Sequence, residues 1–62
     1  MQIVVRGTHT IQEYLQEQKT LQETADKYNK EHKPTAQPTR CWRSIDGTVW
    51  IEYENGQAVC CE

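Results

Sequence analysis

The sequence predicts an α+β fold, in which one amphipathic helix packs on a four-stranded, mostly antiparallel sheet in the order β-α-β-β-β. The dipeptides Asp46-Gly47 and Asn55-Gly56 divide the last third of the chain into three β-prone runs, and such dipeptides favour tight hairpins. Upstream of these runs, apolar residues recur at helical spacing. We therefore expect one small domain with an edge strand at 1–7, a helix at 10–32, a proline loop at 33–39 and a three-stranded meander at 40–62.

Length and charge limit the classes of function. A chain of 62 residues leaves little room for the ~300–1,000 Å³ clefts that bind small molecules. Its formal net charge of −2 disfavours a nucleic-acid binder, whose domain is normally basic. No apolar run approaches the roughly 18 residues of a membrane span, and no signal peptide opens the chain. We therefore expect no enzymatic activity, no cofactor, no metal and no membrane association.

The first half of the chain predicts a strand followed by a helix. Residues 2–6 are rich in β-branched side chains and stop at Gly7, which is typical of a short strand. Thr10 and Glu13 have the spacing of a capping box, which starts a helix. The apolar stripe expected to cover the sheet consists of Ile11, Tyr14, Leu15, Leu21, Ala25 and Tyr28.

The predicted helix is longer than the predicted strands. Twenty-one helical residues span about 31 Å, whereas six-residue strands span about 20 Å. The helix must therefore either overhang the sheet or break near Lys19-Thr20. Thr20 and Glu23 offer a second capping box, so both alternatives remain open.

The register of the meander decides which face of the sheet meets the helix. Two-residue loops at 46–47 and 55–56 pair Trp42 with Ile51 and Ile51 with Cys60. They turn one set of side chains toward the helix: Trp42, Ser44, Val49, Ile51, Tyr53, Ala58 and Cys60. They leave the other set uncovered: Cys41, Arg43, Ile45, Trp50, Glu52, Val59 and Cys61. A three-residue loop at 45–47 instead places both tryptophans on one side, because a slip of one residue reverses the faces.

In either register a tryptophan lies beside an arginine on the uncovered face. One interpretation is local packing, with Arg43 and Trp50 forming an exposed cation–π pair. The other is a protein-binding surface, since Trp, Tyr and Arg dominate interface hot spots. The candidate binding residues are Trp50, Arg43, Trp42, Ile45, Val59 and Glu52. The expected partner is another protein or a second copy of the chain.

The three cysteines are predicted to be free thiols. Cys41 lies on the first strand of the meander and Cys60-Cys61 on the third, about 9.5 Å away, whereas a disulfide needs Cα atoms within about 7 Å. Free thiols indicate a reducing compartment, so we expect a cytoplasmic protein. The cysteines and histidines lack the spacing of zinc sites. Pairing of Cys41 with His32 as a nucleophile is the weaker interpretation of those residues.

Two resemblances bear on function. Residues 20–29 resemble the first helix of helix-turn-helix and winged-helix regulators, although Pro34 and Pro38 disfavour the recognition helix that should follow. This resemblance implies DNA binding, with phosphate contacts from Lys19, Lys27, Lys30, Lys33, Arg40 and Arg43. In size, charge and order of elements, the chain also resembles small acidic proteins that phages encode to block host machinery. We expect a non-enzymatic protein-binding module, such as a phage-type inhibitor or modulator, with a winged-helix DNA-binding regulator as the alternative.

Overall fold

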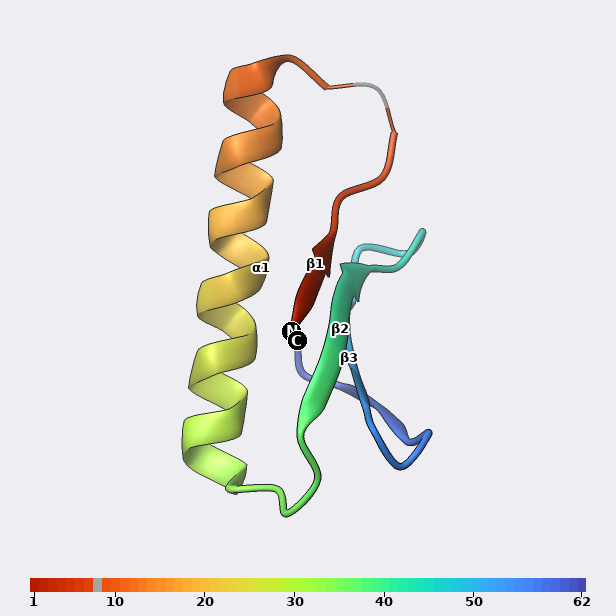
Figure 1. Cartoon of the computed structure of the whole chain (residues 1–62). Coiled ribbons are helices and arrows are strands. Elements are labelled where there is room, and N and C mark those ends of the chain that lie inside the picture. Colours follow the sequence, from red (N-terminus) through yellow and green to blue (C-terminus); the bar gives the residue numbers. More distant parts are fainter. Residues whose placement is uncertain (8) are drawn as a thin grey trace.

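The computed structural model describes residues 1–7 and 9–62, which form one helix packed on a four-stranded sheet (Figure 1). The elements are β1 (Gln2–Val4), α1 (Ile11–His32), β2 (Pro38–Arg43), β3 (Val49–Tyr53) and β4 (Ala58–Cys60). The strand order is β1-β2-β3-β4, with β1 parallel to β2 at one edge and the other pairs antiparallel. The predicted fold class is therefore confirmed.

The helix α1 is continuous and is capped at both ends. The Thr10 hydroxyl accepts from the Glu13 amide at 3.2 Å, and a Glu13 carboxylate oxygen accepts from the Thr10 amide, which is the predicted capping box. At the other end Lys33 adopts the left-handed conformation and donates its amide to the Asn29 carbonyl at 2.9 Å. Thr20 lies inside the helix, so the alternative of a break near this residue is wrong.

The chain after α1 forms a strand earlier than the sequence predicts. The predicted proline loop at 33–39 is shorter in the structure, because β2 already begins at Pro38. The pairing of β2 with β3 has a register irregularity between Pro38 and Arg40. Proline is tolerated at this first position because the ladder does not require its missing amide proton. A winged helix would place its recognition helix in this region, but the chain forms the strand β2 here. Residues 20–29 belong to the long helix α1 and not to a helix-turn-helix fold.

The first turns of α1 extend beyond the sheet (Figure 1). The helix has 22 residues and so spans about 33 Å, whereas the longest strand has six residues and spans about 20 Å. Residues 11–16 are all exposed, and the first fully buried helical residue is Leu21. The predicted apolar stripe is thus correct in its second half and wrong for Ile11, Tyr14 and Leu15, which cover no strand.

Both hairpins have three-residue loops. Ser44 donates its amide to the Thr48 carbonyl at 2.7 Å, and Tyr53 donates its amide to the Gln57 carbonyl at 2.8 Å. Within these loops only the glycines have positive φ, +91° at Gly47 and +85° at Gly56. This is the geometry of a type I turn followed by a left-handed glycine. The two-residue loops expected from the sequence are therefore wrong, and the three-residue alternative holds for the first hairpin.

The longer loops reverse the facing of β2 and β4 relative to the two-residue prediction. Trp42 pairs with Trp50, and Ile51 pairs with Cys41 on one side and Val59 on the other. The side facing α1 forms a small core whose buried members are Leu21, Ala25, Cys41, Val49, Ile51 and Tyr53. Ile3, Val5, Tyr28, Ala36, Val59 and Cys61 are partly buried around it. Ile51 is central, as predicted, but Trp42, Ala58 and Cys60 belong to the opposite face.

Candidate functional site: an apolar end beyond the sheet

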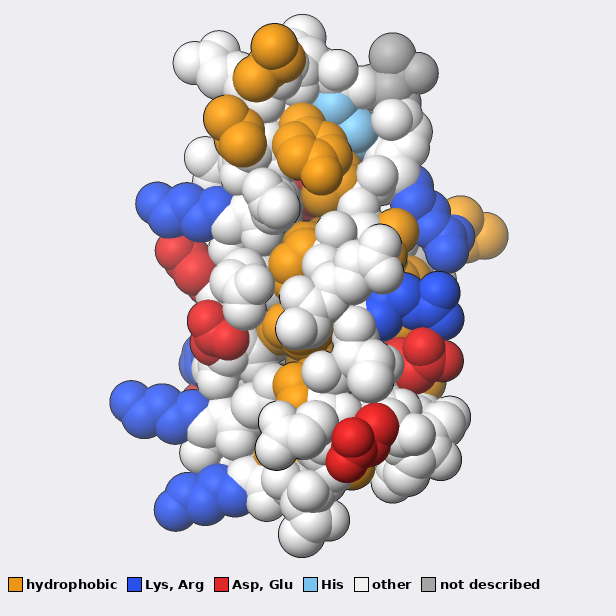
Figure 2. Space-filling view, in the orientation of Figure 1, with side chains coloured by type: hydrophobic (Ala, Val, Ile, Leu, Met, Phe, Trp, Pro, Cys, Tyr) orange, Lys and Arg blue, Asp and Glu red, His pale blue; other side chains and the backbone are white. Residues whose placement is uncertain are grey.

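Four large apolar side chains are exposed at the end of the molecule where α1 overhangs the sheet. Ile11, Tyr14 and Leu15 are 81%, 41% and 55% exposed, and Ile45 is fully exposed in the loop between β2 and β3. Figure 2 shows hydrophobic side chains gathered over the first turns of the helix. The β2–β3 loop lies toward the same end, because β2 runs in that direction (Figure 1). We call Ile11, Tyr14, Leu15 and Ile45 the apolar end.

An open cavity of about 320 Å³ lies at this end of the fold, and Ile45 is the residue of the apolar end that lines it. Val4 and Ile45 are its apolar lining residues, and Gly7 and Ser44 are small residues that also line it. Its remaining lining residues are the polar Arg6, His9, Glu17 and Arg43. The cavity therefore joins the connection before α1 to the first hairpin.

One ion pair fixes the wall of this cavity nearest the core. The Arg43 guanidinium donates to both Glu17 oxygens, at 2.9 and 3.2 Å, and to the Gly47 carbonyl at 2.9 Å. The hydrogen bonds to Glu17 are the main cause that raises the pKa of Arg43. A planar guanidinium suits this two-point contact. Arg43 thus ties the helix, β2 and the hairpin together, and its charge is already neutralised.

Arg6 differs from Arg43 in its contacts. Its side chain is exposed and lines the cavity, and across residues 1–7 and 9–62 the structure shows ion pairs only at Arg40–Glu52 and Arg43–Glu17. The backbone carbonyl of Arg6 accepts a hydrogen bond from the Nε2 of His9. The lining therefore carries one positive charge that Glu17 does not offset.

The face of the sheet away from α1 carries both tryptophans. Trp42 and Trp50 are direct cross-strand partners and both are half-buried. The Arg40 guanidinium lies 5.4 Å from the Trp42 ring centroid and pairs with Glu52 at 2.8 Å. The Trp50 Nε1 donates to the Thr48 hydroxyl at 2.8 Å. The polar and charged groups around the indoles are thus partnered within the sheet itself.

The structure separates the six predicted binding residues into three places. Trp42, Trp50 and Glu52 share the uncovered face, and Ile45 lies at the apolar end. Arg43 and Val59 lie on the side of the sheet that α1 covers, so their expected place on the uncovered face is wrong. The expected pair of Arg43 with Trp50 is wrong for the same reason, and Arg40 with Trp42 takes its place. Arg6 was not among the predicted binding residues, and its only signal in the sequence was its position at the end of the β-branched run at 2–6.

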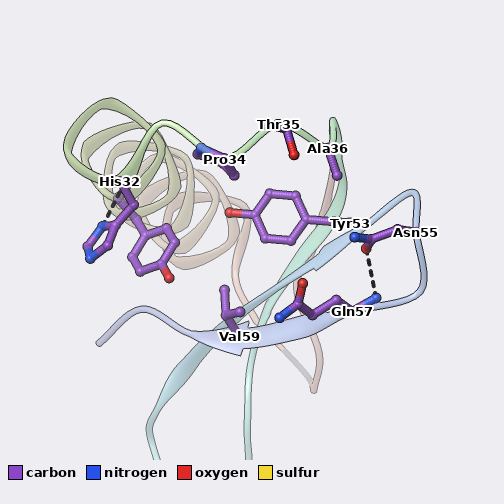
Figure 3. A pocket seen from close by; sticks show the side chains of 9 residues that line it. His32, Pro34, Thr35, Ala36, Tyr53, Asn55, Gln57 and Val59 are labelled. Carbon is purple, nitrogen blue, oxygen red and sulfur yellow. Dashed lines mark hydrogen bonds between the residues drawn. The ribbon is translucent and has the colours of Figure 1, made fainter.

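A second cavity, of about 290 Å³, lies at the opposite end of α1 (Figure 3). Tyr28 and His32 stack there with ring centroids 4.0 Å apart, one helical turn from each other. The Tyr53 hydroxyl donates to the Asn29 side chain at 2.7 Å. Pro34, Thr35 and Ala36 form one rim and Asn55 and Gln57 the other (Figure 3). The Tyr53 hydroxyl and the Asn55 side chain make their hydrogen bonds within the protein, to Asn29 and Gln57. This is typical of a region that stabilises the fold.

The cysteines lie apart from any reactive arrangement in the described chain. All three are free, as predicted. Cys41 is fully buried, donates to the Leu21 carbonyl at 3.7 Å, and has its pKa raised to about 11 by burial. His32 is exposed and stacks on Tyr28, so the structure gives it no contact with Cys41. Among residues 1–7 and 9–62, no three His, Cys, Asp or Glu side chains are placed to hold a metal ion.

No known protein family, curated protein or solved structure is similar enough to this chain to suggest a relative. The helix described here is not apolar enough along its length to cross a membrane.

Proposed function

We propose that this protein is a non-enzymatic binding module that recognises a protein partner through its apolar end. The observation that carries this proposal is the exposure of Ile11, Tyr14 and Leu15 on the first turns of α1, with Ile45 fully exposed in a loop directed toward the same end of the molecule (Figure 1). Scattered exposed hydrophobics are ordinary, whereas clustered ones mark interaction sites. The other surfaces of the fold offer a weaker case, because their aromatic side chains are half-buried or hydrogen-bonded internally.

The architecture supports the same proposal. A helix that served only to cover the sheet would need a length of about 20 Å. The additional turns of α1 carry apolar side chains that do not reach the core. Ile45 of the β2–β3 loop lines the cavity together with Arg6 and His9 of the connection before α1. A partner that covers this end of the molecule would bury the exposed apolar side chains of α1 and of the loop. Inhibition or modulation of a host protein, in the manner of the phage-encoded proteins that the chain resembles in size, is the form of partner binding that we propose.

Affinity capture from a host lysate, with nuclease treatment, tests the proposal. The parent protein is compared with Leu15→Gln and Ile45→Ser, which remove apolar surface from exposed positions without touching the core. Gln12→Ala, an exposed change in the same protruding turns, is the matched control. We expect the parent and the control to retain one protein partner in the presence of nuclease, and both test variants to lose it.

Trp50→Ala separates the two candidate surfaces. If this variant alone loses the partner while Leu15→Gln retains it, the uncovered face of the sheet is the binding site and the proposal for the apolar end is wrong. If the parent retains only nucleic acid that moderate salt releases, phosphate binding by counterion release is the better account. In that case the protein-binding proposal fails as a whole.

A further inference from the structure

We infer that the cavity at the apolar end receives one large aliphatic side chain of the partner, and that Arg6 pairs with a carboxylate side chain beside it. This inference rests on the proposed function and specifies the chemistry of the partner. The cavity volume of about 320 Å³ lies at the low end of ligand sites, which suits a side chain rather than a whole cofactor. Its apolar walls, Val4 and Ile45, match an aliphatic group.

Charge complementarity identifies the neighbouring group. The cavity lining contains two arginines and one glutamate, and both oxygens of Glu17 accept hydrogen bonds from Arg43. The positive charge of Arg6 remains, because no carboxylate in the described chain pairs with it. His9 also lines the cavity, and its Nε2 is engaged by the Arg6 carbonyl. A carboxylate that approaches Arg6 therefore meets a net positive site.

The arrangement also determines which kind of carboxylate fits. The cavity is lined by the connection before α1, with Arg6 and Gly7, and by the first hairpin, with Ser44 and Ile45. A segment that contacts both the connection and the hairpin must pass across the cavity rather than end in it. The carboxylate is therefore that of an Asp or Glu side chain next to the aliphatic residue, and not a chain terminus.

Titration of the ¹⁵N-labelled protein with short blocked peptides tests this inference directly. The probes are three tetrapeptides, acetylated and amidated, that contain Leu-Glu, Leu-Gln or Ser-Glu at the centre. We expect saturable shifts of the Arg6, Gly7, Ser44 and Ile45 amides with Leu-Glu, at a Kd of ~1 mM. An exposed ion pair should make Leu-Glu bind about two- to fivefold tighter than Leu-Gln, and burial of the leucine should make it bind about tenfold tighter than Ser-Glu.

Two variants connect these preferences to the proposed residue. Arg6→Gln should bind Leu-Glu and Leu-Gln equally, while Arg40→Gln, a matched change on the uncovered face of the sheet, should keep the parental preference. Both residues are exposed, so the amide spectrum of each variant should show the parental fold. Increasing salt should reduce the preference for Leu-Glu in the parent.

Several outcomes would overturn the inference. Equal shifts with all three probes, or shifts centred on residues outside the cavity, would show that the cavity does not select this chemistry. Tighter binding of N-acetyl-leucine than of the Leu-Glu peptide would indicate a terminal carboxylate instead. If Ile45→Ser abolishes capture of the partner while no probe binds, the proposed function stands and this inference alone fails.

Discussion

Leu15 and Leu21 offer a direct test of the overhang, because they are the same residue type on one helix in opposite environments. Leu21 is fully buried against the sheet, whereas Leu15 is 55% exposed. Leu21→Ala removes a side chain from the core and leaves a cavity, at an expected cost of about 2–5 kcal/mol in the free energy of unfolding. Leu15→Ala removes partly solvated surface and slightly improves helix propensity, so we expect a change within about 0.5 kcal/mol.

The difference is large relative to the stability of such a chain. At about 0.05–0.15 kcal/mol per residue, a protein of 62 residues unfolds with about 3–9 kcal/mol. Leu21→Ala should therefore lower the urea midpoint strongly or leave the chain partly unfolded, whereas Leu15→Ala should unfold like the parent. Urea titration followed by far-UV circular dichroism measures the free energy of unfolding of both variants, and we expect the same slope of that free energy against urea concentration for each.

Protein concentration separates the two ways in which this reasoning could fail. If Leu15→Ala costs as much as Leu21→Ala at every concentration, the first turns of α1 pack within the monomer and the overhang is wrong. If Leu15→Ala is neutral in dilute protein but destabilising in concentrated protein, a second copy buries Leu15. That result would make the apolar end a site of self-association.

Three further predictions concern the cap, the far cavity and the thiols. Thr10→Ala should speed amide exchange in the first turn of α1 while changing the urea midpoint little, because residues 11–16 are exposed; a large global loss would contradict this. Tyr53→Phe should lower the free energy of unfolding by about 0.5–1.5 kcal/mol, through loss of the hydrogen bond to Asn29; an unchanged urea midpoint would show that the hydroxyl is solvated. Timed alkylation read by mass spectrometry should label exposed Cys60 first and buried Cys41 only on unfolding, with three thiols per denatured chain; early labelling of Cys41 would place it outside the core.

The sequence determines the elements of this fold better than it determines their register. The capping box at Thr10, the single long helix and the positions of both turns follow from local patterns, because each depends on a few neighbouring residues. The loop length does not. A two-residue loop needs positive φ at both residues of the Asx-Gly dipeptide, whereas each observed loop needs it only at its glycine, Gly47 in the first and Gly56 in the second. An Asx-Gly dipeptide is compatible with both loop lengths.

The side chains of the turns show which geometry is chosen and why sequence alone leaves it open. Asp46 accepts from the Thr48 amide at 3.1 Å, and Asn55 accepts from the Gln57 amide at 3.0 Å. These contacts two residues ahead are typical of Asx turns. In the resulting register Cys41 is buried and Ser44 leaves the core side.

The apolar end illustrates a different limit. The helical spacing that identifies Ile11, Tyr14 and Leu15 as one stripe is the same spacing that identifies Leu21 and Ala25 as core. Whether a stripe residue is covered depends on the length of the strands opposite it, which is a property of the whole fold. The arithmetic of helix and strand lengths gave the overhang as one of two alternatives, and the structure selects it. The chemistry of the site, above all Arg6, follows only from the three-dimensional arrangement.

The protruding turns of α1 are difficult to explain by the stability of the monomer. Residues 11–16 are all exposed, and the capping box at Thr10 maintains their helical start locally. Exposed Ile11 and Leu15 contribute little burial there, and glutamine at either position would preserve helix propensity. Large apolar side chains at positions where folding would accept polar ones are disadvantageous for solubility unless another surface covers them. This asymmetry between the two halves of one helix is why we assign the second half to the core and propose the first half for a partner.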